Sequence, residues 1–332
     1  MIYNLLPQND VLECPRGWKK VGCMPQYLIT GGAGFIGSHL TDYLVGLGHS
    51  VTVLDNLSTG RRSNLHESVE MIEGDISNSK HLDALMARVD GCFHLAAVAS
   101  VQQYKDGWAE VAKVNLYGSI RVLEAAARAG VPVVYASSAA IYGDNTDRPL
   151  LETSVPKPIS GYGADKLATE YHAAALSGGL GLNSTGLRFF NVYGPRQAPD
   201  SPYSGVISIF LSRLAATKSI TVFGDGEQAR DFVYVSDVAA TLARAMAWTA
   251  AGNCGVFNIC RGEATTLNTL IGVLGEVLGV TPQVSYAAAR TGDIRVSIGA
   301  SAAAAAAFQF KSDVLLNEGL RLTADWIQSA SR

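Results

Sequence analysis

Residues 27–37, YLITGGAGFIG, decide how this chain folds. Residues 27–30 form the short apolar run of a buried strand, glycines follow at every third position, and an apolar helical pattern begins beside them. Such glycines let the backbone turn tightly against a pyrophosphate, and the free N–H groups at the start of the helix attract its negative charge. The stretch therefore predicts a dinucleotide-binding turn formed by Gly31, Gly34, Phe35, Ile36 and Gly37.

The chain beyond this turn alternates between strand and helix patterns. Short apolar runs predict strands at 27–30, 51–54, 92–97, 131–136 and 183–190, and helical patterns cover 35–47, 80–89, 111–129 and 163–177. Nearly continuous apolar runs are typical of parallel strands that are covered on both faces. We therefore expect an α/β fold, a doubly wound parallel sheet of the Rossmann type with a smaller C-terminal substrate-binding lobe.

The composition is that of a globular chain. Of its 332 residues 48% are hydrophobic and 17% are charged, which excludes a disordered protein. The net charge of −3 and the lack of a basic stripe argue against nucleic acid as a partner. No apolar run reaches the ~18 residues of a membrane span, and the N-terminus lacks a signal-peptide pattern, so we expect a cytoplasmic protein. The five cysteines are scattered without a C-x-x-C pair, so we expect no metal site.

Residues between the second predicted strand and the helix at 80–89 indicate which dinucleotide is bound. Asp55 ends the second strand, about twenty residues beyond the turn, where a carboxylate binds the ribose hydroxyls and repels a 2′-phosphate. This favours NAD over NADP, with Asn56 beside it, although Arg61 and Arg62 lie nearby and argue the other way. Asp75 and Ile76 stand where the adenine would be bound, and an ordinary capping role for Asp75 is an open alternative.

The expected domains follow from where these patterns begin and end. Residues 1–23 fit no periodic pattern, so we regard them as an N-terminal appendage. The NAD-binding domain is expected over 24–190, and the patterns loosen into loops rich in proline and glycine beyond it. Residues 191–332 are therefore expected to form the second lobe. The six consecutive alanines at 302–307 favour a short surface helix.

A tyrosine and a lysine four residues apart are the candidate catalytic pair. Tyr162 and Lys166 would lie on one face of a helix, about one turn apart. A nearby ammonium favours the phenolate, so Lys166 and a bound nicotinamide would lower the phenol's pKa and make Tyr162 a usable base. Ser138 stands at the carboxyl end of a predicted strand, where reactive groups belong in such sheets.

Together these motifs resemble the extended short-chain dehydrogenase/reductase family, and most closely its UDP-hexose 4-epimerase branch. The resemblance covers roughly residues 26–330 and implies that Ser138 assists catalysis, that Tyr162 is the base and that Lys166 binds the nicotinamide ribose. It also implies further cofactor contacts from Leu95, Ala96, Ala97, Asn115 and Phe189. Dehydratases of the family carry an acidic pair directly after the serine and decarboxylases favour a glutamate there, whereas this chain has Ala139 and Ala140.

The same resemblance implies a UDP-sugar site in the second lobe. Asn191 would bind the sugar diphosphate, Arg230 and Arg290 would clamp it, and Asp293 would bind the uridine ribose. The nucleotide would also contact Val206, Val222 and Phe223. The position four residues beyond the aspartate limits the room at the sugar's second carbon. It is Ser297 here, which predicts that UDP-GlcNAc and UDP-GalNAc are accepted besides UDP-Glc and UDP-Gal.

Three alternatives to a UDP-hexose 4-epimerase remain at this point. The chain could epimerise another nucleotide sugar, such as a UDP-uronic acid, or reduce a 4-keto sugar on the same scaffold. It could also be a non-catalytic NAD-binding sensor, although such proteins commonly lose the Tyr–Lys pair that Tyr162 and Lys166 form here. Family members commonly form homodimers through two helices, which correspond to 111–129 and 163–177.

Overall fold

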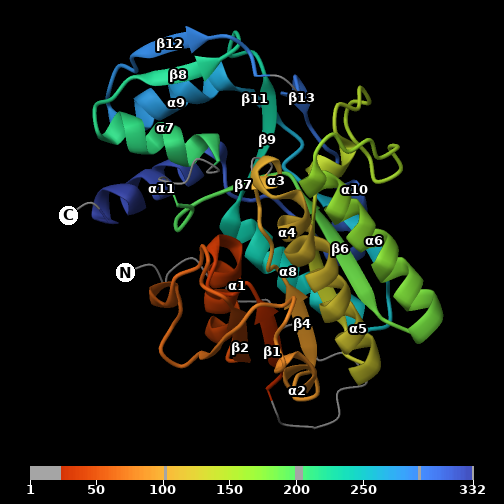
Figure 1. The fold of residues 1–332 in the computed structure, drawn as a ribbon. Coiled ribbons are helices and arrows are strands. Elements are labelled where there is room, and N and C mark those ends of the chain that lie inside the picture. The colour runs from red at the N-terminus through yellow and green to blue at the C-terminus, as the bar shows by residue number, and fades with distance from the viewer. Residues whose placement is uncertain (1–23, 101–102, 199–204, 291–292, 331–332) are drawn as a thin grey trace.

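The computed structural model describes residues 24–100, 103–198, 205–290 and 293–330 (Figure 1). The N-terminal appendage expected at 1–23 lies outside the described residues. Among the described residues no helix is long and apolar enough to cross a membrane.

A seven-stranded parallel sheet forms the centre of the molecule (Figure 1). Residue pairs such as Ile29 with Val53 and Ile29 with Phe93 place the strand of the glycine turn between two neighbours. The order across the sheet is β10 (Gly255–Ile259), β6 (Ser184–Phe189), β5 (Val133–Ser138), β4 (Gly91–His94), β1 (Gln26–Thr30), β2 (Ser50–Asp55) and β3 (Glu70–Glu73). The predicted doubly wound sheet is therefore confirmed.

Helices cover both faces of this sheet, each over its own apolar core. One face packs against α1 (Phe35–Gly46), α8 (Val235–Ala250) and α10 (Ala302–Phe308). The other packs against α2 (Leu82–Met86), α5 (Ser119–Ala129) and α6 (Gly161–Leu180). Strands between two such layers must be apolar on both sides, which explains their continuous apolar runs. The alanine run at 302–307 forms a helix, as expected: α10 begins at Ala302, the first of the six alanines.

The helix predicted at 111–129 consists of three pieces. It begins as α4 (Trp108–Ala112), widens into a π-helical segment (Lys113–Gly118) and continues as α5. Ser119 Oγ donates a hydrogen bond to the Asn115 carbonyl at 2.5 Å, which competes with regular α-helical bonding. Gly130, with φ of 69°, ends the helix as predicted. The short helix α3 (Gln103–Asp106) precedes it, and 3₁₀ turns form at Arg62–Asn64 and Ala139–Tyr142.

A smaller lobe lies at the carboxyl ends of the parallel strands (Figure 1). Its strands are β7 (Asn191–Tyr193), β8 (Ile220–Phe223), β9 (Ala229–Tyr234), β11 (Ala264–Thr266), β12 (Val284–Ala287) and β13 (Val296–Ser297). Strand β9 pairs with β7, β11 and β13, while β8 pairs with β12. Its helices are α7 (Val206–Ala215), α9 (Leu267–Leu278) and α11 (Leu316–Ala330), which share one apolar core.

The boundary expected at residue 190 does not separate the two lobes. Beyond it the chain returns to the large sheet, where α8 packs beside α1 and β10 pairs in parallel with β6. Strand β6 is buried along its whole length, so an edge position would expose its apolar side chains and backbone groups. The apolar run 256–259 after a helical stretch is the signal that the sequence interpretation passed over.

Candidate active site

A cavity of about 230 Å³ opens at the carboxyl ends of the parallel strands. Gly31 and Gly37 form its floor, since a Cβ on Gly31 would lie 2.6 Å from the Ala96 nitrogen and one on Gly37 would lie 2.2 Å from the Gly31 oxygen. Gly31 also has a φ of +72°, which other residues rarely adopt. The predicted cofactor residues that line this cavity are Gly31, Gly34, Phe35, Ile36, Gly37, Asp55, Asn56, Asp75, Ile76, Leu95, Ala96 and Ala97.

The Asp55 carboxylate is fixed beside the glycine turn. Its Oδ2 accepts a hydrogen bond from the Ala33 backbone N–H at 3.0 Å, and its Oδ1 accepts one from the Leu57 N–H at 2.8 Å. Arg61 and Arg62, which argued for a 2′-phosphate, are both exposed, and neither lines the cavity. The negative charge at the end of β2 therefore faces no basic side chain within the cavity lining.

Asp75 lines the cavity and caps no helix. Its Oδ1 accepts a hydrogen bond from the Ser77 N–H at 2.8 Å, as in an Asx turn. Its Oδ2 accepts one from Asn56 Nδ2 at 2.9 Å, and both residues line the cavity. This contact joins the ends of β2 and β3 into one wall.

Four predicted cofactor residues do not line the cavity: Asn115, Tyr162, Lys166 and Phe189. Asn115 lies in the π-helical segment, fully buried, where its Oδ1 accepts from the Val98 N–H at 2.7 Å and its Nδ2 donates to the Val98 carbonyl at 3.0 Å. Val98 itself lines the cavity, so Asn115 acts through it. Phe189 packs inside the apolar core on the α1 side of the sheet.

The sequence missed several residues of the cavity wall. They follow strand ends or lie on neighbouring elements: Leu54, Ser58, Thr59, Gly74, Val98, Ala99, Val114 and Ala136. Ser58 and Thr59 stand three and four residues after Asp55, the last residue of β2, so their place in the chain was a usable signal. Ala136 could not be identified from its residue type, because small apolar residues fill most buried strands.

Ser138 and Tyr162 meet at the carboxyl end of β5. Ser138 is the last residue of that strand, and Tyr162 lies in the first turn of α6, which Ser160 caps by accepting a hydrogen bond from the Gly163 N–H at 3.1 Å. The Ser138 side chain lies close enough to the Tyr162 hydroxyl to lower its pKa. Ser138 Oγ also accepts from the Ala140 N–H at 3.1 Å, which leaves its own proton for the contact with Tyr162 or a ligand.

Lys166 is buried behind this pair. Its Nζ lies 5.8 Å from the centroid of the Tyr162 ring and donates to the Ala136 carbonyl at 2.8 Å. Burial lowers the pKa of Lys166 to about 8. Burial raises the pKa of Tyr162, against the lowering that the nearby Ser138 side chain provides. Burial is the larger influence on the pKa of Tyr162, and the lowering expected from Lys166 together with a bound nicotinamide stays a prediction.

The turn after Ser138 has no acid. Ala139 and Ala140 begin the 3₁₀ turn Ala139–Tyr142, and both are half-buried. Neither methyl side chain can donate or accept a proton, so the acidic pair that eliminates a hydroxyl in the dehydratases has no equivalent at these positions.

The predicted substrate residues gather on and around β9. Asn191 in β7 donates from Nδ2 to the Asp231 carbonyl at 3.2 Å, and Ser297 in β13 is the register partner of Arg230. Arg230 Nη2 donates to Asp293 Oδ1 at 2.6 Å, so the expected diphosphate ligand and the expected ribose ligand bind each other in the protein alone. Asn191, Arg230 and Ser297 thus lie on three neighbouring strands, β7, β9 and β13.

Arg290 and Phe223 form a second contact in this lobe. The Arg290 guanidinium lies 3.9 Å from the centroid of the Phe223 ring, in cation–π geometry. The side chain of Val222, next to Phe223 in β8, is buried in the core of the lobe, so only its backbone can contact a ligand. Val206 is the first residue of α7 and is half-buried.

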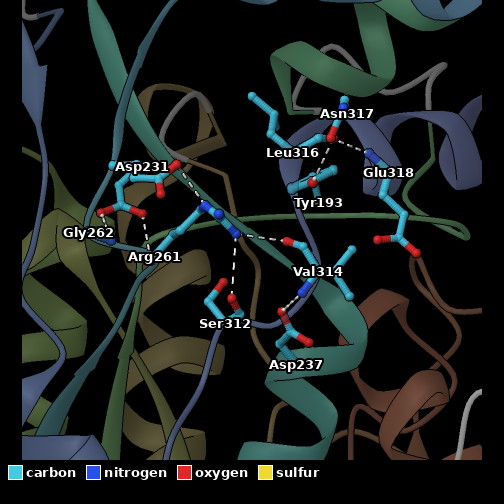
Figure 2. Close-up of polar contacts among 11 residues, drawn as sticks. Tyr193, Asp231, Asp237, Arg261, Gly262, Ser312, Val314, Leu316, Asn317 and Glu318 are labelled. Carbon is cyan, nitrogen blue, oxygen red and sulfur yellow. Dashed lines mark hydrogen bonds and ion pairs between the residues drawn. The ribbon is translucent and has the colours of Figure 1, made fainter.

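Asp231 holds β9 in place, although the sequence interpretation gave it no role. Figure 2 shows its carboxylate next to Arg261 and Gly262. It accepts hydrogen bonds from the backbone N–H groups of these two residues at 2.8 and 2.9 Å. The side chain is fully buried, and burial raises the pKa of Asp231 to about 6. Because Asp231 follows Arg230 directly, these bonds fix where Arg230 points.

The Arg261 side chain connects these hydrogen bonds of Asp231 to the segment before α11 (Figure 2). Its Nη1 donates to the Val314 carbonyl at 3.0 Å, and the Val314 N–H donates to Asp237 Oδ2 at 3.1 Å. Asp237 stands in the first turn of α8, so this segment is tied to the large domain as well as to β9. These bonds lie where the chain crosses between the two lobes.

Comparison with known proteins agrees with this geometry. The model of the NAD dependent epimerase/dehydratase family matches residues 27–260. A UDP-glucose 4-epimerase of Mycolicibacterium smegmatis is 35% identical over 92% of this chain and 99% of its own length. A UDP-glucuronic acid decarboxylase of Arabidopsis thaliana is 32% identical over 84% of this chain and 66% of its own.

Solved structures show the same architecture. The UDP-glucose 4-epimerase of Thermotoga maritima, determined with UDP-glucose, has a TM-score of 0.88 and 39% identity, covering 92% of this chain and all of its own. The UDP-N-acetylglucosamine 4-epimerase of Methanobrevibacter ruminantium has a TM-score of 0.88 and 35% identity, covering 92% of this chain and 99% of its own. This chain therefore belongs to the NAD-dependent epimerase/dehydratase family, the extended short-chain dehydrogenases/reductases that its motifs resemble, and its cofactor is NAD.

Proposed function

We propose that the protein is a UDP-hexose 4-epimerase that works through a transient 4-keto sugar. The observation that carries this proposal is the Lys166 amine 5.8 Å from the centroid of the Tyr162 ring at the start of α6, with Ser138 at the carboxyl end of β5. The relatives named above as UDP-glucose and UDP-N-acetylglucosamine 4-epimerases support the same reaction.

The cavity beside this pair fits NAD. Its glycine floor leaves no room for side chains, and the start of α1 presents free N–H groups to a pyrophosphate. Asp55 would accept the adenosine ribose hydroxyls, the wall of Asn56, Asp75 and Ile76 would hold the adenine, and Leu95 to Ala97 would line the path to the nicotinamide. When bound, NAD supplies a hydride acceptor that can also return the hydride.

The protein's own groups handle the proton. Tyr162 Oη, as phenolate, takes the proton of the sugar's 4-hydroxyl, while Ser138 Oγ shares a hydrogen bond with the same oxygen. Lys166, as ammonium, binds the nicotinamide ribose and stabilises the phenolate. The proton returns from Tyr162 when the 4-keto sugar, turned about its diphosphate link, is reduced on its other face. The cycle needs no other acid, which agrees with Ala139 and Ala140.

Residues around β9 would hold the UDP-sugar. Arg230, released from Asp293, would bind the diphosphate together with Arg290 and Asn191, and Asp293 would turn to the uridine ribose. Val206, Val222 and Phe223 would contact the nucleotide from α7 and β8. Ser297, beside Arg230 in the sheet, is small enough to admit an acetamido group, so we include UDP-GlcNAc and UDP-GalNAc among the substrates.

We propose in addition that the protein acts as a homodimer through the helices beside its active site. Figure 1 shows α4, α5 and α6 together on one face of the sheet, and these helices pack against each other. Trp108 on α4, Tyr117 in the π-helical segment and Tyr171 on α6 are each more than half exposed. Aromatic side chains on adjacent helices are a typical core of a protein–protein interface.

The test of the proposed reaction is incubation with a panel of UDP-sugars, with chromatographic separation of the C4 epimers. A 4-epimerase produces UDP-Gal from UDP-Glc and UDP-GalNAc from UDP-GlcNAc with no net change in absorbance at 340 nm. A 4-keto reductase would consume reduced nicotinamide in proportion to product. A decarboxylase would release carbon dioxide from UDP-glucuronic acid, and an epimerase specific for UDP-uronic acids would act on that substrate alone.

A further inference from the structure

A buried histidine lies directly before the wall of the cofactor cavity, and the reaction described above does not use it. His94 is the last residue of β4 and is 1% exposed, and the next three residues, 95–97, line the cavity. Both ring nitrogens have a hydrogen-bond partner: Nδ1 lies 2.7 Å from Thr30 Oγ1, and Nε2 lies 2.8 Å from Ser119 Oγ. The imidazole therefore bridges the end of β1 and the start of α5.

The partners of the ring determine which nitrogen carries the proton. Ser119 Oγ donates its only proton to the Asn115 carbonyl at 2.5 Å, so it can only accept a hydrogen bond from His94. Nε2 of the ring must therefore be protonated. Burial lowers the pKa of His94 to about 3, so the ring is neutral near pH 7. Nδ1 is then an acceptor, and the Thr30 hydroxyl donates to it.

This chain of hydrogen bonds reaches the cavity wall at both ends. Thr30 Oγ1 accepts a hydrogen bond from the Ala96 N–H at 3.4 Å. At the other end, the Asn115 amide binds both backbone groups of Val98, at 2.7 and 3.0 Å. Ala96 and Val98 both line the cavity. The wall at 95–98 is thus held from β1 on one side and from the π-helical segment on the other, and His94 joins these two supports.

The wall also packs closely against the glycine turn. A Cβ on Gly31 would lie 2.6 Å from the Ala96 nitrogen, so the two backbones meet with no room for a side chain between them. A displacement of Ala96 would therefore also disturb the turn that faces the pyrophosphate.

We propose that His94 is a positioning residue of the cofactor site: as the Nε2–H tautomer it joins Thr30 to Ser119 and so keeps the wall at 95–98 in place for NAD. This inference rests on the cofactor and not on which sugar reacts. A wall that is ordered before binding loses less conformational entropy when the dinucleotide enters, so NAD is held more tightly. Imidazole suits this task because a single neutral ring offers one donor and one acceptor.

The first test is the tautomer itself. The purified protein with its bound NAD is labelled with ¹⁵N in the histidine rings, and the His94 signals are assigned by their loss in His94→Gln. The ¹⁵N chemical shifts and the couplings to the ring protons distinguish the two neutral tautomers and the imidazolium. We expect a protonated Nε2 and an unprotonated Nδ1 at pH 7. A proton on Nδ1, alone or together with one on Nε2, overturns the proposal.

The second test measures how fast bound NAD is released from variants that lack one of these hydrogen bonds. Thr30→Val keeps the shape of the side chain and removes the donor to Nδ1, whereas Ser119→Ala removes the acceptor for Nε2. Ile271→Val is the matched control, because it removes one methyl group from the core of the second lobe and leaves the wall intact. Exchange of bound NAD for isotope-labelled NAD is followed without any sugar, well below the unfolding temperature of each variant.

We expect Thr30→Val and Ser119→Ala to release NAD about 3- to 10-fold faster than the unmodified chain, because each loses one support of the wall. Ile271→Val should release NAD at the unmodified rate. Unchanged release from either folded variant, or an equal acceleration in Ile271→Val, overturns the proposal. The tautomer is measured in the unmodified chain, so it decides even where a variant does not fold. Because neither test includes a sugar, failure here is distinct from failure of the proposed reaction.

Discussion

Arg230 and Asp293 bind each other at 2.6 Å in the second lobe, although the motifs assign one to a diphosphate and the other to a ribose. Gln228 Nε2 also contacts Asp293 Oδ2, at 3.4 Å. The ion pair keeps two charged side chains ordered at a half-buried site until substrate arrives. In the proposed function, binding of a UDP-sugar would exchange this ion pair for two sets of ligand contacts.

Removing the arginine should weaken substrate binding more than it slows the chemistry. A hydrogen bond to a charged group contributes roughly 1.5–3 kcal/mol, so Arg230→Ala should raise the KM for UDP-Glc on the order of 10- to 100-fold. Arg230→Lys retains the charge without the planar pair of donors, so its KM for UDP-Glc should lie between those of the unmodified chain and Arg230→Ala. Steady-state kinetics decide this, and a fall in kcat with an unchanged KM would contradict the assignment.

Tyr162→Phe should remove the base with little effect on folding. The change deletes one hydroxyl group in the first turn of α6, and the rate should fall by a factor on the order of 10² to 10⁴. Circular dichroism checks the fold, and turnover of UDP-Glc measures the loss. Near-normal turnover would show that another group takes the proton.

A larger side chain at position 297 should narrow the substrate range. Ser297→Tyr should lower kcat/KM for UDP-GlcNAc by about tenfold or more relative to UDP-Glc, because overfilling a packed site carries a cost of roughly 1–3 kcal/mol. Ser297→Ala is the matched control that keeps the space. Equal losses on both substrates would place Ser297 outside the pocket for the second carbon of the sugar.

Stability should depend on pH through Asp237. Burial raises its folded pKa from 3.8 to about 6, so its contribution to stability is complete below its unfolded pKa and is lost as the pH rises through 6. Between pH 4 and pH 8, Asp237→Asn should therefore gain about 2 kcal/mol in unfolding free energy relative to the unmodified chain, since one pH unit corresponds to about 1.36 kcal/mol and the unfolded carboxyl is already about half ionised at pH 4.

Denaturant unfolding at several pH values measures this difference. Glu276→Gln, on the exposed surface of α9, is the control and should follow the unmodified chain at every pH. A difference in unfolding free energy between Asp237→Asn and the unmodified chain that stays the same at every pH would contradict the expected titration.

Charged residues on the aromatic face should separate the proposed dimer. Trp108→Glu combined with Tyr171→Glu places two carboxylates on the face formed by α4 and α6, where desolvating them would be costly. Light scattering after size exclusion should show twice the chain mass for the unmodified protein and the chain mass for the double variant. Tyr286→Glu, an equally exposed tyrosine of the second lobe, should leave the mass unchanged; a monomeric unmodified chain would refute the dimer.

Much of the fold could be predicted because its signals are local. The run at 27–37 contains a buried strand, a glycine turn and a helix start, and each depends on neighbouring residues alone. Strand β10 was missed because its place in the sheet depends on pairing with β6, a contact between residues far apart in the chain. Periodicity cannot show which edge of a sheet a distant strand will cover.

In the candidate site, too, some residues could be predicted from the sequence and others depend on contacts between distant parts of the chain. Asp55 was predicted for the cavity from its distance to the turn, and the structure places it in the cavity wall. The resemblance implied a cofactor contact for Asn115, whereas its side chain binds the backbone of Val98 in the cavity wall. Asp231 received no role, since a buried carboxylate is recognised by the partners that fold around it.

The most direct test of the account is the fate of the hydrogen at C4 of the sugar. UDP-glucose carrying deuterium at C4 is incubated with the purified protein, and the UDP-galactose formed is analysed by mass spectrometry and NMR. The account predicts that deuterium is retained at C4 of the product, because the hydride that leaves C4 returns to it on the other face. Loss of the deuterium to solvent, or formation of no UDP-galactose, would contradict it.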